Sequence, residues 1–203
     1  MSEMQPNEWL RWICDTQNTE ELTQKYNQWA DHYDEQVGQA WSSVPVAAAY
    51  LLAKYRDDKP SLIMDVGAGT GLAGVALASL GFQRLIAVDL SQDMLNQAKQ
   101  KNIYESLVCC AIDEPQFASL PMVSGMIATG VLAENHAGAN ELRQLQKKIT
   151  VGGVVVFTAR RSFLPKLELI LNQPEWRLLS SKILPVYDDP VQLFAYQILA
   201  DAA

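Results

Sequence analysis

The sequence predicts an α/β fold: a mostly parallel, doubly wound sheet of seven strands that ends in an antiparallel hairpin and is preceded by a helical lid. From Leu62 onward, short apolar runs alternate with amphipathic segments, which is the pattern of parallel strands joined by crossover helices. Two further strand-like runs, Arg177–Leu184 and Val191–Leu199, are separated only by residues 185–190. Because so short a connection cannot hold a crossover helix, these last strands are expected to pair antiparallel.

The segment Asn7–Tyr55 has helical periodicity. A short amphipathic stripe comes first and consists of Trp9, Leu10, Trp12 and Ile13. A second helix is expected to begin at Asn18, since Glu21 three residues later completes an N-cap signature. A third helix is expected over Val46–Tyr55, directly after Pro45.

The remainder alternates strand and helix. The expected strands before the hairpin are Leu62–Val66, Leu85–Val88, Ser106–Cys110, Gly125–Thr129 and Val154–Ala159. The expected helices between them are Leu72–Leu80, a helix capped by Ser91 that runs to Lys101, and Ala139–Ile149. Gly152 and Gly153 are expected to form the turn before the fifth strand.

Length and charge limit the class of protein. With 203 residues, 49% of them hydrophobic, the chain can bury one sizeable core. Residues 1–203 are therefore expected to form one domain, with a helical lid and first helices in 1–55 and an α/β core in 61–203. The net charge of -7 argues against nucleic-acid and anionic-membrane partners, because affinity for phosphates comes from clustered Lys and Arg.

The cysteines and the N-terminus bear on the compartment. Cys14, Cys109 and Cys110 cannot all pair, and none has the spaced Cys and His partners of a zinc site, so no metal is expected. No stretch reaches the roughly 18 to 20 apolar residues that a membrane span requires, and the N-terminus lacks the pattern of a secretory signal. We expect a cytoplasmic protein that is a monomer or weak dimer.

A glycine-rich segment directly follows the first strand. It reads Asp65, Val66, Gly67, Ala68, Gly69, Thr70, Gly71 and leads straight into a helix. Glycines allow a ligand to approach the backbone closely, and a helix N-terminus presents unpaired N–H groups. Asp89 follows at the tip of the second strand, where a carboxylate can accept both hydroxyls of a ribose. Together these features predict a site for a nucleoside-containing cofactor.

Two cofactors fit this spacing. Gly69–Gly74 also reads GxGxxG, so an NAD-dependent oxidoreductase is an alternative. Three features favour S-adenosylmethionine (SAM). The Asp65 carboxylate would repel a pyrophosphate but can bind, directly or through water, the amino group of a methionine. About sixty mostly helical residues precede the first strand, and the C-terminal hairpin is foreign to a simple dinucleotide-binding half.

These segments carry a resemblance to a known family. DVGAGTG, AVDLS, the following helix and the glycine pair before VVVFTAR resemble motif I, the acidic position after it and the fifth-strand region of Rossmann-like class I SAM-dependent methyltransferases. The resemblance covers nearly the whole chain. Within that superfamily, YNQWADHYDE resembles the opening helix of small free-standing methyltransferases. ATGVLAENHAG, ELRQL and GGVVVFTAR are similar to methyltransferase-like proteins of the Williams-Beuren-region type.

The resemblance implies roles for individual residues in SAM binding. The loop under the methionine and ribose would be formed by Gly67, Ala68, Gly69 and Gly71. Asp89 would hold the ribose hydroxyls and Leu90 would lie against adenine. After the third strand, Ile112 and Asp113 would reach the adenine, with Ala111 as an alternative occupant and a plain loop acid as the alternative role for Asp113. Thr129 and Gly130 would border the methyl group.

Three aromatic residues share one helix face. Tyr26, Trp29 and Tyr33 are spaced i, i+3 and i+7, and core packing alone would explain such a stripe. The resemblance implies a second role, in which this helix folds over the cofactor. Tyr26 and Tyr33 would then bind the SAM carboxylate, and Trp29 would shield the sulfonium.

Methyl transfer needs little from side chains beyond alignment and exclusion of water, and a general base helps only when the acceptor must lose a proton. His136, in the loop after the fourth strand, is the candidate base beside Glu134 and Asn135; an exposed loop histidine is the alternative. The expected reaction is methyl transfer to a small-molecule acceptor with S-adenosylhomocysteine (SAH) as product. A SAM-binding sensor or partner module without activity is a further alternative.

Overall fold

A computed structural model describes residues 12–13, 15–186 and 188–200. Its sheet has seven strands in the order β3-β2-β1-β4-β5-β7-β6. The strands are β1 (Leu62–Val66), β2 (Arg84–Asp89), β3 (Ser106–Cys109), β4 (Val123–Leu132), β5 (Ile149–Arg160), β6 (Trp176–Leu184) and β7 (Val191–Ile198). The first five are parallel to one another, whereas β7 pairs antiparallel with both β5 and β6. The predicted fold class, including the C-terminal hairpin, is confirmed.

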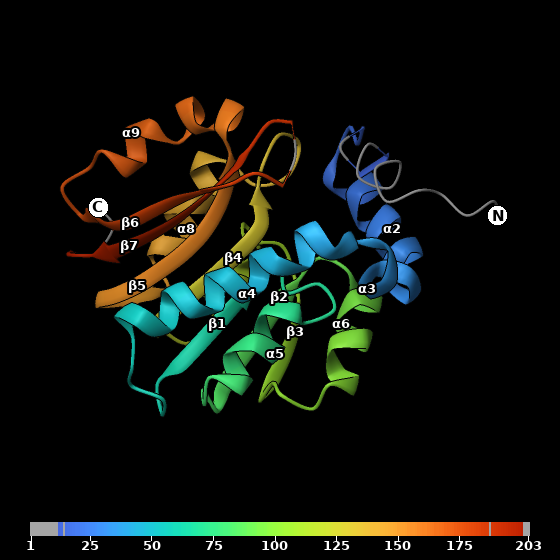
Figure 1. The fold of residues 1–203 in the computed structure, drawn as a ribbon, viewed down its shortest axis with the longest axis horizontal. Coiled ribbons are helices and arrows are strands. Elements are labelled where there is room, and N and C mark those ends of the chain that lie inside the picture. Colours follow the sequence, from blue (N-terminus) through green and yellow to red (C-terminus); the bar gives the residue numbers. More distant parts are fainter. Residues whose placement is uncertain (1–11, 14, 187, 201–203) are drawn as a thin grey trace.

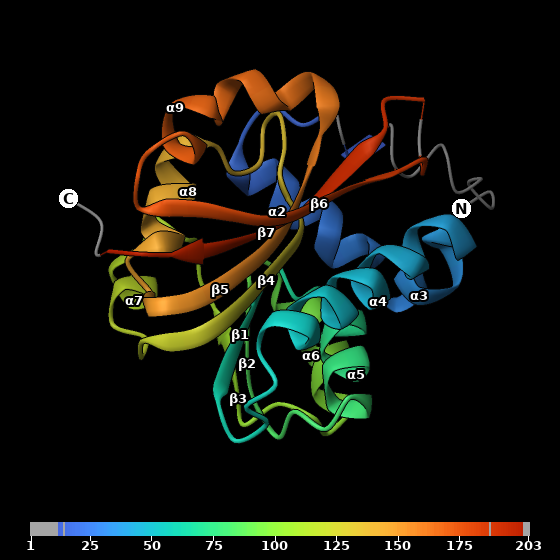
Figure 2. The ribbon, with the colours of Figure 1, turned by 60° about the vertical axis from the view of Figure 1, so that its left-hand side comes forward.

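The helices cover both faces of the sheet (Figure 2). On one face lie α4 (Gly38–Tyr55), α5 (Leu72–Ser79) and α6 (Gln92–Gln100); on the other lie α7 (Pro115–Ala118), α8 (Ala139–Gln146) and α9 (Glu168–Leu171). The side chains of β1 alternate between two buried clusters. In β1, Met64 and Val66 join the α8 side, while Ile63 joins the α4 side. Strand order reverses between β1 and β4, and their carboxyl ends are where such folds bind ligands.

The N-terminal helices lie beside α6, at one end of the molecule (Figure 1). They are α2 (Thr19–Trp29), the short 3-10 helix η1 (Ala30–His32) and α3 (Tyr33–Gln36). Asn18 caps α2, since its Oδ1 accepts the N–H of Glu21 at 2.9 Å, as the sequence predicted. Of the expected first stripe, Trp9 and Leu10 lie outside the described residues, as does Cys14.

Several boundaries differ from the sequence prediction. Strand β4 runs over Val123–Leu132 rather than Gly125–Thr129, and α8 ends at Gln146 rather than at Ile149. Helix α4 begins at Gly38, and Pro45 lies inside it. A proline removes one helical hydrogen bond. The helix nevertheless continues through Pro45, because Val44 before it and Ala48 after it are completely buried and their packing stabilises the helix. Strand β5 begins at Ile149, so Gly152 and Gly153 lie at an irregularity within the strand rather than in a turn before it.

The described helices include none with the length and apolar character needed to cross a membrane. A further 3-10 helix, η2 (Arg161–Lys166), follows β5 and leads into α9.

Candidate functional site

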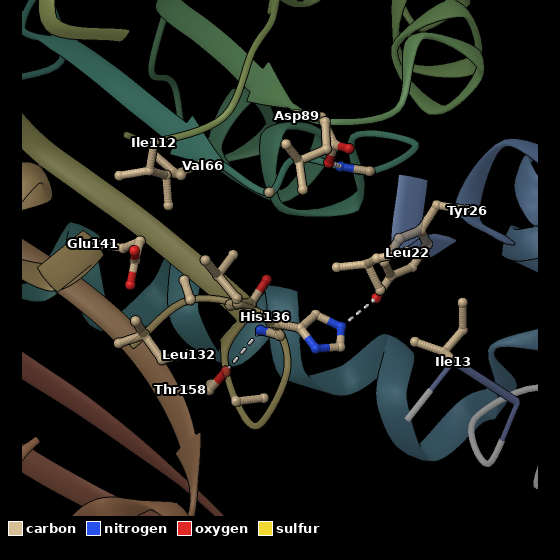
Figure 3. A pocket seen from close by; sticks show the side chains of 18 of the residues that line it. Ile13, Leu22, Tyr26, Val66, Asp89, Ile112, Leu132, His136, Glu141 and Thr158 are labelled. Carbon is tan, nitrogen blue, oxygen red and sulfur yellow. Dashed lines mark hydrogen bonds between the residues drawn. The ribbon is translucent and has the colours of Figure 1, made fainter. Parts of the chain in front are cut away.

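A cavity of about 340 Å³ lies at the carboxyl ends of β1, β2 and β4, with α2 along one side (Figure 3). Its size is that of a typical small-molecule site. Most residues that the sequence nominated line it: Tyr26, Trp29, Tyr33, Gly67, Gly69, Asp89, Leu90, Ile112, Asp113, Thr129, Gly130 and His136. Ala68 lines a smaller adjoining cavity with Gly67 and Gly69. Asp65 and Gly71 line neither.

The glycine-rich loop has the backbone that its sequence predicts. Gly67, Gly69 and Gly71 have φ values of 64°, 53° and 90°, in the left-handed region that favours glycine. A Cβ on Gly67 would lie 2.3 Å from Val131 Cγ2, whereas a Cβ on Gly69 would meet no protein atom within 4 Å. Gly69 therefore faces open space in the cavity, where ligand atoms can approach its backbone.

Asp89 is bound to the same loop. Its Oδ2 accepts the Gly69 N–H at 2.7 Å, and its Oδ1 accepts the Ser91 N–H at 2.9 Å. Burial raises the pKa of Asp89, and the N–H groups of Ser91, Gly69 and Leu90 oppose that rise. An ionised carboxylate has about four acceptor positions. Asp89 can therefore accept ligand hydroxyls while it keeps both backbone contacts.

The structure places Asp65 outside the cavity lining. Its side chain is 1% exposed, and Tyr104 donates its hydroxyl to Asp65 Oδ2 at 2.6 Å. Burial raises the pKa of Asp65 to about 7, against the lowering effect of the Tyr104 hydrogen bond. Tyr104 also packs against the helix that follows the loop, because a Cβ on Gly74 would lie 2.1 Å from its hydroxyl. The third glycine of GxGxxG thus makes room for Tyr104.

The aromatic stripe lies on α2 and α3, which together with η1 form the segment called the lid here (residues 19–36), and it both packs in the core and lines the cavity. Trp29 is 1% exposed and packs with Leu22 and Met94, and its ring meets that of Tyr33 edge to face at 4.7 Å. The Trp29 Nε1–H donates to Gln36 Oε1 at 3.0 Å. The same helix also lines the cavity with Leu22 and Tyr26. The stripe is therefore core on one side and cavity wall on the other.

His136 faces the lid across the cavity (Figure 3). Its Nδ1 lies 3.0 Å from the Glu134 carbonyl oxygen, and its Nε2 lies 3.4 Å from the Tyr26 hydroxyl. Because a carbonyl can only accept, Nδ1 carries the proton, and Nε2 of the neutral ring has the lone pair. Burial lowers the pKa of His136 and the charge of Arg160 lowers it further, while the bond to Glu134 opposes them. Neighbouring Asn135 has a φ of 59°, an uncommon value that shapes this loop.

Several lining residues escaped the sequence analysis. Thr158 of β5 accepts the Gly130 N–H at 2.9 Å, and a Cβ on Gly130 would lie 2.9 Å from the Trp41 ring. Glu141 lines the cavity and accepts the Gly138 N–H at 2.7 Å. No local pattern marks these positions, because they come from elements that meet only in the fold. Among the described residues, no cluster of His, Cys, Asp or Glu could hold a metal ion.

Comparison with known proteins finds similarity to methyltransferases. Residues 63–150 match the family model described as a methyltransferase domain. Methyltransferase-like protein 27 of Homo sapiens is 32% identical over 146 residues, which are 69% of this chain and 59% of that protein. Ribosomal protein L11 methyltransferase of Lactobacillus acidophilus is 25% identical over 122 residues, covering 59% of this chain and 38% of that protein. The chain thus spans less than two thirds of either curated relative.

The fold matches a solved structure more completely. The N-methyltransferase NodS from Bradyrhizobium japonicum WM9, in complex with SAH, has a TM-score of 0.69 to this chain at 14% sequence identity. The match covers 90% of this chain and 99% of that one. At this identity the likeness shows the fold alone.

Proposed function

We propose that this chain, whose residues 63–150 match a methyltransferase domain, is a class I, SAM-dependent enzyme that transfers the methyl group of SAM to a small-molecule acceptor and releases SAH. The observation that carries the proposal is the joint placement of Asp89 and Gly69. The Asp89 carboxylate holds the Gly69 amide at 2.7 Å, and Gly69 itself faces open cavity. This pairing puts a ribose-binding acid beside backbone that a ligand can reach.

The residues present fit the cofactor. Asp89 would accept the ribose hydroxyls, and Leu90 and Ile112 would flank the adenine. Gly67 and Gly69 would lie under the methionine and ribose parts of SAM. When bound, SAM supplies an electrophilic methyl group on a sulfonium leaving group. The protein then has to align the acceptor and exclude water. Tyr26 and Trp29 of the lid would provide that exclusion, since both line the cavity from α2.

His136 is our candidate for the proton acceptor. Its neutral ring offers Nε2 toward the cavity, and the lowered pKa keeps that nitrogen unprotonated at neutral pH. An acceptor hydroxyl or protonated amine must lose a proton for its lone pair to attack, which is the step that a base assists. The Tyr26 hydroxyl lies 3.4 Å from the same nitrogen. A bound acceptor would therefore replace the Tyr26 hydroxyl at Nε2 or contact Nε2 beside it.

Support for a small-molecule acceptor comes from the cavity and the charge. Beyond Gly130 the lining includes the apolar Leu132, Ala137 and Phe163, and α2 closes one side. The charged side chains there are Glu134, Glu141 and Arg160. The net charge of -7 disfavours nucleic acid. One relative is named for a ribosomal protein acceptor, so a protein substrate belongs in the same assay. We also propose a cytoplasmic location, a single domain over 1–203 and a monomeric or weakly dimeric state.

Calorimetry with SAM, SAH and NADH tests the cofactor. We expect heat of binding with SAM and SAH and none with NADH; binding of NADH alone would point to the oxidoreductase alternative. A turnover assay that detects SAH should follow, with pooled small metabolites and a ribosomal protein as separate acceptors. Product with metabolites only supports the proposal. Product with the protein only contradicts the acceptor class, and binding without product in either arm favours a sensor or partner module.

A further inference from the structure

The lid is joined to the cofactor-binding residues by hydrogen bonds as well as by apolar packing. Asn27, in the last turn of α2, accepts the hydroxyl of Ser91 with its Oδ1 at 2.5 Å. The N–H of the same serine donates to Asp89 Oδ1 at 2.9 Å, and the Gly69 N–H donates to Asp89 Oδ2 at 2.7 Å. An unbroken chain of contacts therefore runs from the lid through Ser91 and Asp89 to the glycine-rich loop.

A second link reaches the same loop from the other end of the lid. Thr70, between two of the loop glycines, donates its hydroxyl to Asp34 Oδ1 at 2.5 Å. Asp34 Oδ2 is paired with Lys101 Nζ at 2.8 Å, which holds the carboxylate in place against the end of α6. Asn27 of α2 thus binds Ser91, which follows the tip of β2, and Asp34 of α3 binds Thr70 within the glycine-rich loop.

The burial of the two hydroxyls explains why these links matter. Ser91 is 0% exposed and Thr70 is 2% exposed with the lid in place. Water cannot reach them there, so loss of the Asn27 or Asp34 side chain leaves a buried hydroxyl without its acceptor. When the lid is lifted, water can satisfy both hydroxyls. Removal of either lid side chain should therefore disfavour the closed lid specifically, with little effect on the core.

We propose that Asn27 and Asp34 are positioning residues that couple lid closure to cofactor binding, Asn27 through Ser91 and Asp89, and Asp34 through Thr70. The inference rests on the proposed function, because it takes SAM or SAH as the ligand of Asp89. The coupling is reciprocal: a ligand that orders Asp89 and the glycine-rich loop favours the closed lid, and the closed lid slows ligand release.

Asp31 offers a matched control on the same segment. It accepts the side-chain amide of Gln97 at 2.6 Å, so it too ties the lid to α6. Its contact is exposed and reaches neither Asp89 nor the glycine-rich loop. Asp31→Ala therefore removes a lid contact of the same kind but leaves intact the series of hydrogen bonds from Asn27 through Ser91 to Asp89.

The test is the dissociation rate and affinity of SAH in the full-length protein. We expect Asn27→Ala to raise the dissociation rate roughly tenfold and Asp34→Ala roughly threefold, since Asp34 is more exposed. Asp31→Ala should stay within about twofold of wild type, because exposed contacts contribute little. Asn27→Asp, which keeps the acceptor oxygen, should recover most of the affinity. Thr70→Val removes the donor of the hydrogen bond to Asp34, so it should raise the dissociation rate as much as Asp34→Ala does.

A double-mutant cycle separates coupling from general loosening of the lid. If Asn27 acts through Asp89, Asn27→Ala should weaken SAH binding in the wild-type background but by less than about twofold in an Asp89→Ala background. Equal effects in both backgrounds would overturn the proposed route. Should Asn27→Ala fail to fold in a thermal melt, the Asp34→Ala and Thr70→Val pair decides the proposal alone. Wild-type protein that does not bind SAH would refute the proposed function; wild-type binding with unchanged release from all of these variants would refute only this inference.

Discussion

The backbone amide of Gly69 donates to Asp89 Oδ2 at 2.7 Å, so the glycine-rich loop and the tip of β2 are joined without a ligand. Residues that are distant in sequence thereby form one surface. The same carboxylate accepts from Ser91, the N-cap of α6. Changes at Asp89 should therefore act on the ligand and on the loop together.

Asp89→Ala should weaken SAM and SAH binding by roughly 2 to 3 kcal/mol, the range for charge-assisted hydrogen bonds. The fold should persist, because the side chain lies at a strand end rather than in the core. Calorimetry with SAH measures the loss, and Asp89→Asn is the control, since its oxygen can still accept one backbone N–H. Unchanged SAH affinity in a folded Asp89→Ala protein would remove the main support for the cofactor site.

Gly69→Val should abolish SAH binding. Gly69 has a φ of 53°, and the space around its missing Cβ holds no protein atom within 4 Å, so the added side chain would occupy the ligand's place. Gly152→Val is a matched control, because Gly152 has a φ of 82°, equally open surroundings and a position remote from the cavity lining. Both variants should lose stability in a thermal melt, but only Gly69→Val should lose the ligand. Loss of SAH binding in both would mean that backbone strain alone is responsible.

His136→Gln should lower the methyl-transfer rate by roughly 10²- to 10⁴-fold, the usual contribution of a general base, while SAH affinity changes little. Because burial lowers the pKa of His136, wild-type activity should rise with pH through a value below the ordinary histidine pKa and then level off. NMR titration of the His136 ring gives that pKa without any acceptor. A pKa above the ordinary value, or a His136→Gln variant of wild-type rate, would exclude the base role.

Asp65 should make the protein less stable as pH rises. Its pKa is raised from 3.8 to about 7 in the folded state, so the folded protein holds a proton that the unfolded chain has already lost within that window. The free energy of unfolding should fall as pH increases through the window and change no further above it. Urea unfolding at about pH 5 and about pH 8 tests this, with Asp65→Asn as the control for all other titrating groups. An equal change in the free energy of unfolding between the two pH values in both proteins would show that Asp65 is not the group responsible.

The lid should gain order when ligand binds. Amides from Tyr26 to Tyr33 should become more protected from hydrogen exchange on addition of SAH, while strands β1 and β5 should change little. The lid buries Leu22 and Trp29 against Met94, so its baseline protection should exceed that of a frayed terminus. Equal protection with and without SAH would identify a permanently fixed helix. It would exclude the proposed binding of the SAM carboxylate by Tyr26 and Tyr33.

Sequence alone predicted the strands, the C-terminal hairpin and the ligand-binding backbone, because these depend on local chemistry. Apolar periodicity distinguishes strand from helix, glycine permits the positive φ values at Gly67 and Gly69, and Asn18 caps a helix through a neighbour three residues away. The position of Asp89 followed from the length of one strand-helix-strand unit. Helix α4 was misjudged at its start because the rule that proline ends helices is also local, whereas burial of Val44 and Ala48 is not.

Only the tertiary structure decided which side chains meet. The sequence predicted that Asp65 binds the amino group of the methionine, directly or through water; it gave no sign that Tyr104, in the loop before β3, donates to this carboxylate. Asn27 meets Ser91 and Thr70 meets Asp34 across separations that no periodicity encodes. The physical reason is that buried polar groups must find partners wherever packing places them, and packing is settled by the whole core at once. Local sequence therefore determined the strands, the longer helices of the α/β core and the backbone of the glycine-rich loop, while the assembled fold chose the partners that hold the lid and the loop in place.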